Sequence, residues 1–475
     1  MIVGRYPYGY IASFALIALA STFTSVALVY QPRALAALAV MIVLVLALWH
    51  PRSLLVAVIV GCALYEGIYL NYRISVASLP LSALDLFPVI ALIAGYSIRS
   101  RSARTPISPS GSTALGLLSI GFVTGCVLGL ANHAAFAQWA KVDRVEFELL
   151  VTLVAALVAG STPAWRRALV TGLYVAAAIA AVLQIGSFAY ATGFHHPLWS
   201  SFSFGATNVA NLTDSLTPDR IAATRDNYLP TFIMLPGLAL ALYRLRRVDV
   251  VLIVAVVIAT AMCLSRAMWL AAGITIIIAL LARFASGRPL HTGATIGLIA
   301  GAALALFVVG DIGGNILAAR VAGSFGGSDI SLIRRQSETD EAFARLRSTP
   351  FTFVAGLGAG SFIPAIHEAA PTPILEDQLL AKWTNFGLVS VIGTIWLLLF
   401  GGVAAFHALR RRTSLDTDVM ALGLCLPAIV IVSIFSGTLL ELNVSFPLWL
   451  LAGTVYASAR AGKQQRVAAT AVDPL

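Results

Sequence analysis

Three arginines have positions that could bind a phosphate-bearing ligand at the surface of a membrane. Arg220 and Arg225 come just before an apolar stretch that begins near residue 228, and Arg266 lies in a short turn between two apolar stretches. A guanidinium at that depth is costly unless it faces water, a partner or a ligand, and arginine is the side chain best suited to bidentate phosphate recognition. We therefore expect a clamp for a lipid-linked pyrophosphate. The alternative is that these arginines reach lipid head groups or pair with nearby carboxylates, namely Asp219, Asp226 and Glu441.

Two carboxylates and one histidine could supply a general base. Glu376 and Asp377 stand where a long polar segment meets the next apolar stretch. A carboxylate at such a boundary can have a raised pKa and accept a proton from a reacting hydroxyl group. The alternative is a solvated helix start, where acidic residues are favoured by the helix dipole. His367, in the same polar segment, is either another candidate base or an ordinary loop histidine.

The same polar segment contains alternating glycines in the sequence GLGAGSF, at Gly356, Gly358 and Gly360. Glycine lets a backbone turn tightly or approach a ligand closely, and both uses remain open. A nucleotide-binding loop is not indicated, because no strand–helix–strand pattern surrounds these glycines.

The composition indicates the class of protein that must position these residues. Of the 475 residues, 59% are hydrophobic and only 11% are charged, whereas soluble domains carry about 25% charged residues. We predict an all-α fold, a polytopic integral membrane helical bundle of about 12–14 transmembrane helices with a large, partly helical periplasmic loop. The expected spans are residues 10–30, 34–50, 53–70, 81–98, 111–130, 146–161, 167–192, 228–243, 248–264, 267–283, 290–310, 377–406, 416–435 and 443–458.

The basic residues indicate how the spans are oriented. Short loops on one side of the predicted bundle receive the basic clusters, and the positive-inside rule assigns that side to the cytoplasm. Both termini are then cytoplasmic, and the net charge of +10 reflects topology rather than nucleic-acid binding. The larger clusters are Arg99, Arg101 and Arg104; Arg166 and Arg167; Arg244, Arg246 and Arg247; Arg283 and Arg288; and Arg410, Arg411 and Arg412.

Two predicted outer loops are long, residues 193–227 and 311–376, within a single membrane domain that covers residues 1–475. Long connections are usually functional or disordered. We expect the second loop to fold over the mouth of the bundle and its active site. Part of that loop is amphipathic and predicts a short helix, with Ser337 as N-cap and Pro350 just past its end.

The order of these motifs resembles the O-antigen ligase and O-antigen polymerase superfamily over roughly residues 200–400. That family shows an arginine followed by an asparagine at the start of a span, as from Arg220 to Asn227, and a Ser-Arg turn between two spans, as at Ser265-Arg266. A large periplasmic loop then carries an arginine, a proline and spaced glycines, and leads into a span with a Gly-Leu pair. The matching residues here are Arg334 or Arg335, Pro350, Gly356, Gly358, Gly360, Phe362, Glu376, Gly387 and Leu388.

One position departs from the family pattern. Ligase-type members usually carry a histidine where this chain has Glu376, and that histidine is regarded as the base that activates the acceptor hydroxyl. Glu376 could replace it chemically, or His367 could reach the site. The departure leaves an exopolysaccharide or O-antigen polymerase at least as compatible with the sequence as a ligase.

The resemblance implies a metal-independent glycosyltransferase of the bacterial inner membrane. It would transfer or polymerise a glycan from an undecaprenyl-pyrophosphate-linked donor at the periplasmic face, with a glycan or lipid as acceptor. No cofactor, metal or nucleic acid is implied, and the partners are membrane lipids and other polysaccharide-assembly proteins. The residues expected to stabilise the leaving pyrophosphate are Arg220, Arg225, Arg266, Arg334 and Arg335, and those expected to take the proton are Glu376, Asp377 and His367.

Two other functions remain open at this point. A secondary transporter or flippase for a lipid-linked or anionic solute could use the same arginines as a substrate path. A non-catalytic component of a polysaccharide-assembly complex would need the loops but not single outer-face charges.

Overall fold

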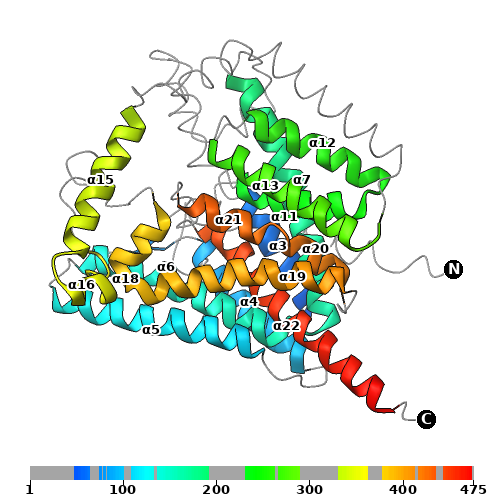
Figure 1. Ribbon diagram of the computed structural model, residues 1–475, viewed down its shortest axis with the longest axis horizontal. Helices are drawn as coiled ribbons and strands as arrows, with labels where there is room; N and C mark the ends of the chain where they lie inside the picture. Colours follow the sequence, from blue (N-terminus) through cyan, green and yellow to red (C-terminus); the bar gives the residue numbers. More distant parts are fainter. Residues whose placement is uncertain are drawn as a thin grey trace, which may run out of the picture.

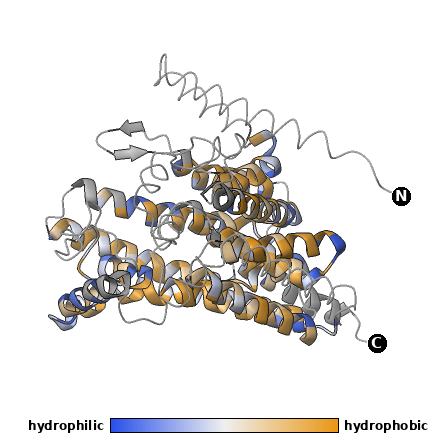
Figure 2. Ribbon diagram, turned by 90° about the horizontal axis from the view of Figure 1, so that it is seen from above, coloured by the Kyte–Doolittle hydropathy of each residue, from blue (hydrophilic) through white to orange (hydrophobic). Residues whose placement is uncertain are grey.

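The computed structural model describes residues 46, 48–64, 74–76, 79–81, 83–100, 108–132, 136–191, 231–262, 266–288, 330–361, 377–411, 416–434 and 442–472. Within these residues the protein is helical apart from one short antiparallel hairpin, in which Ile74 pairs with Leu81 and Val76 with Leu79. In the part of the chain that the structure describes, four helices are long and apolar enough to cross a membrane: Pro109–Ala131, Pro163–Gly186, Ala267–Ala285 and Gln378–Arg410. Hydrophobic residues cover most of the length of the helices, and hydrophilic ones gather near their ends (Figure 2).

The described α-helices range from six residues in α16 to 31 residues in α22. The helices and strands are α3 (Pro51–Leu64), β1 (Ile74–Val76), β2 (Leu79–Leu81), η1 (Ala83–Leu86), α4 (Phe87–Ser100), α5 (Pro109–Ala131), α6 (Phe136–Ala159), α7 (Pro163–Ala191), η2 (Thr231–Ile233), α11 (Met234–Arg244), α12 (Arg247–Met262), α13 (Arg266–Ala285), α15 (Ile330–Leu346), α16 (Pro350–Ala355), α18 (Gln378–Ile395), η3 (Trp396–Phe400), α19 (Gly401–Arg410), α20 (Thr417–Gly423), α21 (Leu426–Ser433) and α22 (Leu442–Val472).

Most predicted spans that fall on described residues correspond to helices, although several helix ends differ from the predicted boundaries. Helix α22 continues to Val472, beyond the predicted end at residue 458. Helix α6 begins at Phe136, well before the predicted start at residue 146. Helix α15 begins at Ile330, so Ser337 lies inside the helix rather than at its N-cap. The predicted spans 10–30 and 290–310, and nearly all of 34–50, lie outside the described residues.

Helix α5 is packed closely against both α6 and α18. Its glycines at positions 121, 125 and 129 recur every four residues, and a β-carbon at Gly125 would lie 2.6 Å from the carbonyl oxygen of Asn385 in α18. Small residues at this spacing let helices approach closely. Phe122 of α5 contacts both Phe147 of α6 and Phe386 of α18, with ring centroids 6.2 and 6.4 Å away.

The contacts along α5 also fix the direction of its neighbours. Gly121 faces Ser390, whereas Gly125, one turn further along α5, faces Phe386. Phe147 of α6 lies beside Phe122 of α5, whereas Trp139, which comes earlier in α6, lies beside Gly129, which comes later in α5. Helices α6 and α18 are therefore both antiparallel to α5 and begin at the same end of the bundle. In the view of Figure 1, α15 and α16 lie at that end and the C-terminal part of α22 extends from the other.

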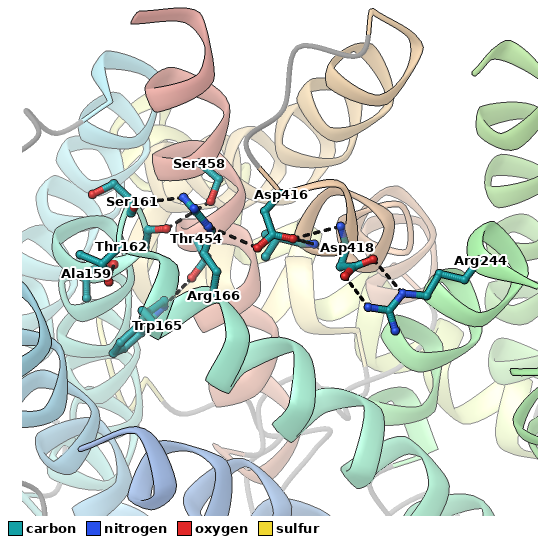
Figure 3. Close-up of polar contacts among 12 residues, drawn as sticks. Ala159, Ser161, Thr162, Trp165, Arg166, Arg244, Asp416, Asp418, Thr454 and Ser458 are labelled. Carbon is teal, nitrogen blue, oxygen red and sulfur yellow. Dashed lines mark hydrogen bonds and ion pairs between the residues drawn. The ribbon is translucent and has the colours of Figure 1, made fainter. Parts of the chain in front are cut away.

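The other end is joined by arginine–aspartate pairs, and we call it the arginine end (Figure 3). Arg166 at the start of α7 lies 3.4 Å from Asp416, and the Nε of Arg244 at the end of α11 donates to Asp418 Oδ1 at 2.7 Å. Asp416 also caps α20 by accepting from the backbone N–H groups of Asp418 and Val419. Side chains from two partner helices thus converge on the first turn of α20.

Two further contacts bring more helix termini to the arginine end. The guanidinium of Arg283, at the end of α13, donates to the carbonyl of Tyr243, next to Arg244. The hydroxyl of Ser286 donates to the carbonyl of Leu409, at the end of α19, over 3.2 Å. Four segments that carry basic clusters, around residues 166, 244, 283 and 410, therefore meet at one end of the molecule.

Candidate functional site

A buried ion pair joins the middle of α6 to the first turns of α18. The ammonium Nζ of Lys382 lies 2.7 Å from both carboxylate oxygens of Glu146. The side chains are only 2% and 4% exposed, and the ammonium also lies 5.0 Å from the centre of the Trp449 ring in α22. Burying two charges is costly even when they are paired. Because buried ionisable groups are common at functional sites, the surroundings of this pair bear on function.

Asp143 lies one helical turn before Glu146 on α6 and is 6% exposed. Its carboxylate faces the thiol of Cys126 on α5, which is a weak hydrogen-bond donor. Burial, with a smaller contribution from the negative charge of Glu146, raises the pKa of Asp143 to about 6, and the facing thiol of Cys126 on α5 acts in the opposite direction. A carboxyl group in this state can bind and release a proton near neutral pH.

Gln378 occupies the corresponding position on α18, one turn before Lys382. Its side chain is 2% exposed, and Oε1 accepts no hydrogen bond from any described residue. Because α6 and α18 begin at the same end of the bundle, Asp143 and Gln378 both flank the ion pair on its outward side. We call Asp143, Glu146, Gln378 and Lys382 the carboxylate–lysine cluster, and its end of the bundle the carboxylate end.

Asp377, a predicted catalytic residue, begins α18 beside this cluster. Its Oδ1 accepts a hydrogen bond from the backbone N–H of Leu380 at 3.0 Å, which makes it the N-cap of the helix. Burial raises the pKa of Asp377, and the hydrogen bonds from the first turn of α18 oppose that shift. Asp377 therefore has the local role that acidic residues commonly play at a helix start, and its carboxyl group is also partly desolvated.

A second set of charges on α6 faces away from the cluster, toward the start of α4. Arg144 lies 3.5 Å from Asp85 and 3.8 Å from Glu148, four residues further along the same helix. The contact between Arg144 and Asp85 joins α6 to η1. They lie on a different face of α6 from Asp143 and Glu146, because residues one apart on a helix point in different directions.

The three predicted loop glycines form a turn that docks against the helices. Gly356, Gly358 and Gly360 have φ angles of 82°, 98° and 73°, in the left-handed region that favours glycine. The turn bonds to both neighbouring helices: Leu357 N–H donates to the Thr384 carbonyl at 2.7 Å and Ala359 N–H to the Gly125 carbonyl at 3.0 Å. The close approach that glycine permits here is to the backbones of α5 and α18.

Helices α15 and α16 are held over the first turns of α18. Ala342 and Leu346 of α15 form a small apolar cluster with Leu380 and Ala381. The indole N–H of Trp383 donates to the Phe353 carbonyl of α16 at 2.6 Å. The amphipathic segment predicted from the sequence thus lies against the start of the helix that carries Lys382. The two predicted arginines of this segment, Arg334 and Arg335, belong to the first half of α15, and their side chains lie outside the described part.

The remaining predicted site residues are not placed by the structure. Arg220, Arg225, His367 and Glu376 lie outside the described residues, and Arg266 is the first residue of α13 but its side chain is not described. The arginine clamp therefore stays a prediction. Asp377 and the three glycines are the predicted residues whose surroundings are known, and both lie at the carboxylate end.

Sequence reasoning missed the carboxylate–lysine cluster, although signals for it existed. Lys382 is the single charged residue between Asp377 and His407 in an otherwise apolar stretch. Asp143 and Glu146 are three residues apart, which places them on one helical face. The predicted span boundary puts them at the border of a loop, whereas a helix that begins at Phe136 brings them inside the bundle.

Among the described residues, no set of three or more histidine, cysteine, aspartate or glutamate side chains is arranged to hold a metal ion. No protein-family model matches the chain. No curated protein matches it significantly in sequence.

Proposed function

We propose that this chain is a multi-pass protein of the bacterial inner membrane with its arginine end in the cytoplasm. Support comes from the four basic segments that meet at that end, because basic loops are retained on the cytoplasmic side. The carboxylate end, with α15 and α16, would then face the periplasm. Both termini would be cytoplasmic, as the charge pattern of the sequence predicts.

The activity that we propose is metal-independent glycosyl transfer from an undecaprenyl-pyrophosphate-linked donor at the periplasmic face. An acceptor hydroxyl oxygen would attack the anomeric carbon of the donor sugar while the bond from that carbon to the pyrophosphate oxygen breaks. The hydroxyl proton would pass to a carboxylate, and undecaprenyl pyrophosphate would leave with the bonding electron pair. The protein would need to supply only cationic stabilisation of the leaving group and a base.

One observation carries this proposal beyond the sequence resemblance. Asp377 is a partly buried carboxyl group with a raised pKa, at the start of the helix over which α15 and α16 are packed. The resemblance expects the base one residue earlier, at Glu376, and the covering loop directly before this helix. Arg220, Arg225 and Arg266, with Arg334 or Arg335, would hold the pyrophosphate, and Glu376 and His367 are the other candidate bases.

The experiment is a reconstitution of the purified protein in liposomes with an undecaprenyl-pyrophosphate-linked oligosaccharide. Wild type, Arg266→Ala and the control Arg345→Ala are compared, since Arg345 pairs with Glu341 on the partly exposed surface of α15. Lengthening of the glycan with donor alone, lost only in Arg266→Ala, would indicate a polymerase. Transfer only after a lipid acceptor is added, with the same loss, would indicate a ligase. Equal transfer by Arg266→Ala at equal protein level would contradict the arginine clamp.

A secondary transporter or flippase is the second candidate function. The observation that favours it is the ionisable cluster between α6 and α18, because transporters place paired charges and proton-binding carboxylates inside their bundles. In the same liposomes, movement of the donor across the bilayer without any new glycosidic bond would support this function and contradict glycosyl transfer.

A further inference from the structure

Two exposed arginines lie beside the last residues of α11, at the arginine end. Arg247 is the first residue of α12, and Arg288 follows α13. The guanidinium carbon of Arg288 lies 4.7 Å from the centre of the ring of Tyr243, which is four residues before Arg247. Helix α11 packs against both α12 and α13 (Figure 1). Neither arginine forms an ion pair with a carboxylate that the structure describes, whereas Arg244 between them is bound to Asp418.

The acidic residue nearest to these arginines in the sequence points into the bundle. Asp249 is only 2% exposed. Its carboxylate oxygens accept hydrogen bonds from the hydroxyl of Tyr174 and from the backbone N–H of Arg246, both at 2.9 Å. The side chain of Arg246 is exposed as well. This part of the surface therefore carries three exposed guanidinium groups, those of Arg246, Arg247 and Arg288, and has a net positive charge.

Exposed apolar side chains continue from these arginines along the outside of the neighbouring helices. Val248 and Val251 are each 69% exposed, and Val251 lies one turn after Arg247 on the same face of α12. Leu281 and Phe284 are 55% and 56% exposed in the last turns of α13, a helix long and apolar enough to cross a membrane. The surface thus has cationic groups at the helix ends and an apolar face along the helices.

This combination of charge and apolar surface selects among the ligands that could cover it. Guanidinium groups bind phosphate oxygens in a bidentate manner, and basic pockets at the cytoplasmic ends of membrane helices bind anionic lipid head groups. A free phosphate ion would contact the arginines but would leave the valines of α12 uncovered. A zwitterionic phospholipid would bring an ammonium group next to three guanidinium groups. An anionic phospholipid satisfies both parts of the surface.

We propose that Arg247 and Arg288, together with Arg246, bind the phosphate of one anionic glycerophospholipid of the cytoplasmic leaflet. Its acyl chains lie along Val248 and Val251 on the outer face of α12. This proposal rests on the membrane placement proposed above and does not depend on glycosyl transfer.

The experiment is native mass spectrometry of the purified, delipidated full-length protein, released from detergent after titration with phosphatidylglycerol or phosphatidylcholine. The spectra count the lipid molecules that stay bound. We expect the first phosphatidylglycerol to bind at a lower concentration than the first phosphatidylcholine. The double variant Arg247→Gln/Arg288→Gln should need about tenfold more phosphatidylglycerol for the same occupancy, because each arginine near an anionic head group adds to the affinity. Its binding of phosphatidylcholine should change little.

The matched control is Arg167→Gln, which removes the same charge from an exposed arginine at the start of α7. The residue one turn after Arg167 is Thr171, which is exposed and polar, so this arginine lacks the apolar face. Arg167→Gln should bind phosphatidylglycerol as the wild type does. If the double variant does not fold, Arg247→Gln carries the same comparison, because it leaves the contact of Arg288 with Tyr243 intact.

Three results would overturn the lipid site. They are equal binding curves for the double variant and Arg167→Gln, equal binding of the two lipids by the wild type, and displacement of phosphatidylglycerol by an equal concentration of glycerol phosphate. The last result would assign the arginines to a free phosphate. If a protein with equal binding curves still transfers glycan, the lipid site alone is wrong. If the expected loss of lipid is seen but no glycan is transferred, glycosyl transfer alone is contradicted.

Discussion

Lys382 and Glu146, which are 236 residues apart in the chain, form a buried ion pair in which the ammonium contacts both carboxylate oxygens at 2.7 Å. This contact ties the first turns of α18 to the middle of α6. Because the cost of burying an ion pair is repaid only while both partners are present, the pair makes specific predictions about single and double substitutions.

Removal of one partner should destabilise the protein strongly. In Lys382→Met, Glu146 would keep its buried charge without a counter-ion, and a loss of about 3–5 kcal/mol is expected. The double variant Lys382→Met/Glu146→Leu should recover most of this loss, because an apolar pair avoids the desolvation of both charges. Thermal or denaturant unfolding in detergent, analysed as a double-mutant cycle, measures the coupling. Additive losses in the double variant would contradict a direct pairing.

The docked glycine turn should tolerate no side chain. Gly358 has a φ of 98°, and a β-carbon there would lie 2.5 Å from the backbone nitrogen of Gly129. Gly358→Ala should therefore cost at least about 1–3 kcal/mol and loosen α16 from α5 and α18. The control is Gly116→Ala on α5, where an added β-carbon meets nothing within 4 Å and helix propensity should raise stability by about 0.5–1 kcal/mol. Unfolding and limited proteolysis around residue 358 measure both effects, and similar outcomes for the two variants would contradict the docking.

The fold and the site were predictable to different extents. Long apolar stretches revealed α5, α7, α13 and the α18–α19 region, because hydropathy alone identifies a helix that can cross a membrane. The start of α6 was missed because Lys141, Asp143, Arg144, Glu146 and Glu148 make that segment as polar as a loop. The charged side chains of this segment pair with residues of other elements, as Glu146 does with Lys382 and Arg144 with Asp85. The local sequence does not show these contacts.

The arrangement of the carboxylate end could not be deduced from local patterns. Lys382 pairs with a residue far away in the sequence, and nothing in the spacing of either residue specifies the other. The glycines show the same limitation. Their alternation predicted a tight turn or a close approach, but only the contacts with Gly125 and Thr384 show that the approach is to other helices.

Stability should depend on the ionisation of Asp143. The pKa of this carboxyl group is raised from 3.8 to about 6, so the folded state binds its proton more tightly than the unfolded chain. The stabilisation of the folded state by this tighter proton binding is fully present below pH 3.8 and is lost as the pH rises through about 6. A pKa shift of this size corresponds to a free energy of about 3 kcal/mol. The Tm of the wild type, measured in detergent, should fall relative to that of Asp143→Asn as the pH rises over this range. The exposed control Asp340→Asn should follow the wild type, and parallel curves for wild type and Asp143→Asn would contradict the prediction.

Asp377 offers a way to separate helix capping from catalysis. Asparagine caps helices about as well as aspartate, so Asp377→Asn should unfold at nearly the wild-type temperature, whereas Asp377→Ala should lose about 1 kcal/mol. A base cannot be replaced by an amide, so glycosyl transfer in Asp377→Asn should fall by at least about 100-fold if Asp377 accepts the proton. Transfer and unfolding are measured on the same preparations, with Arg345→Ala as the control for both. Full transfer by Asp377→Asn would leave Asp377 with the capping role alone and would move the base to Glu376 or His367.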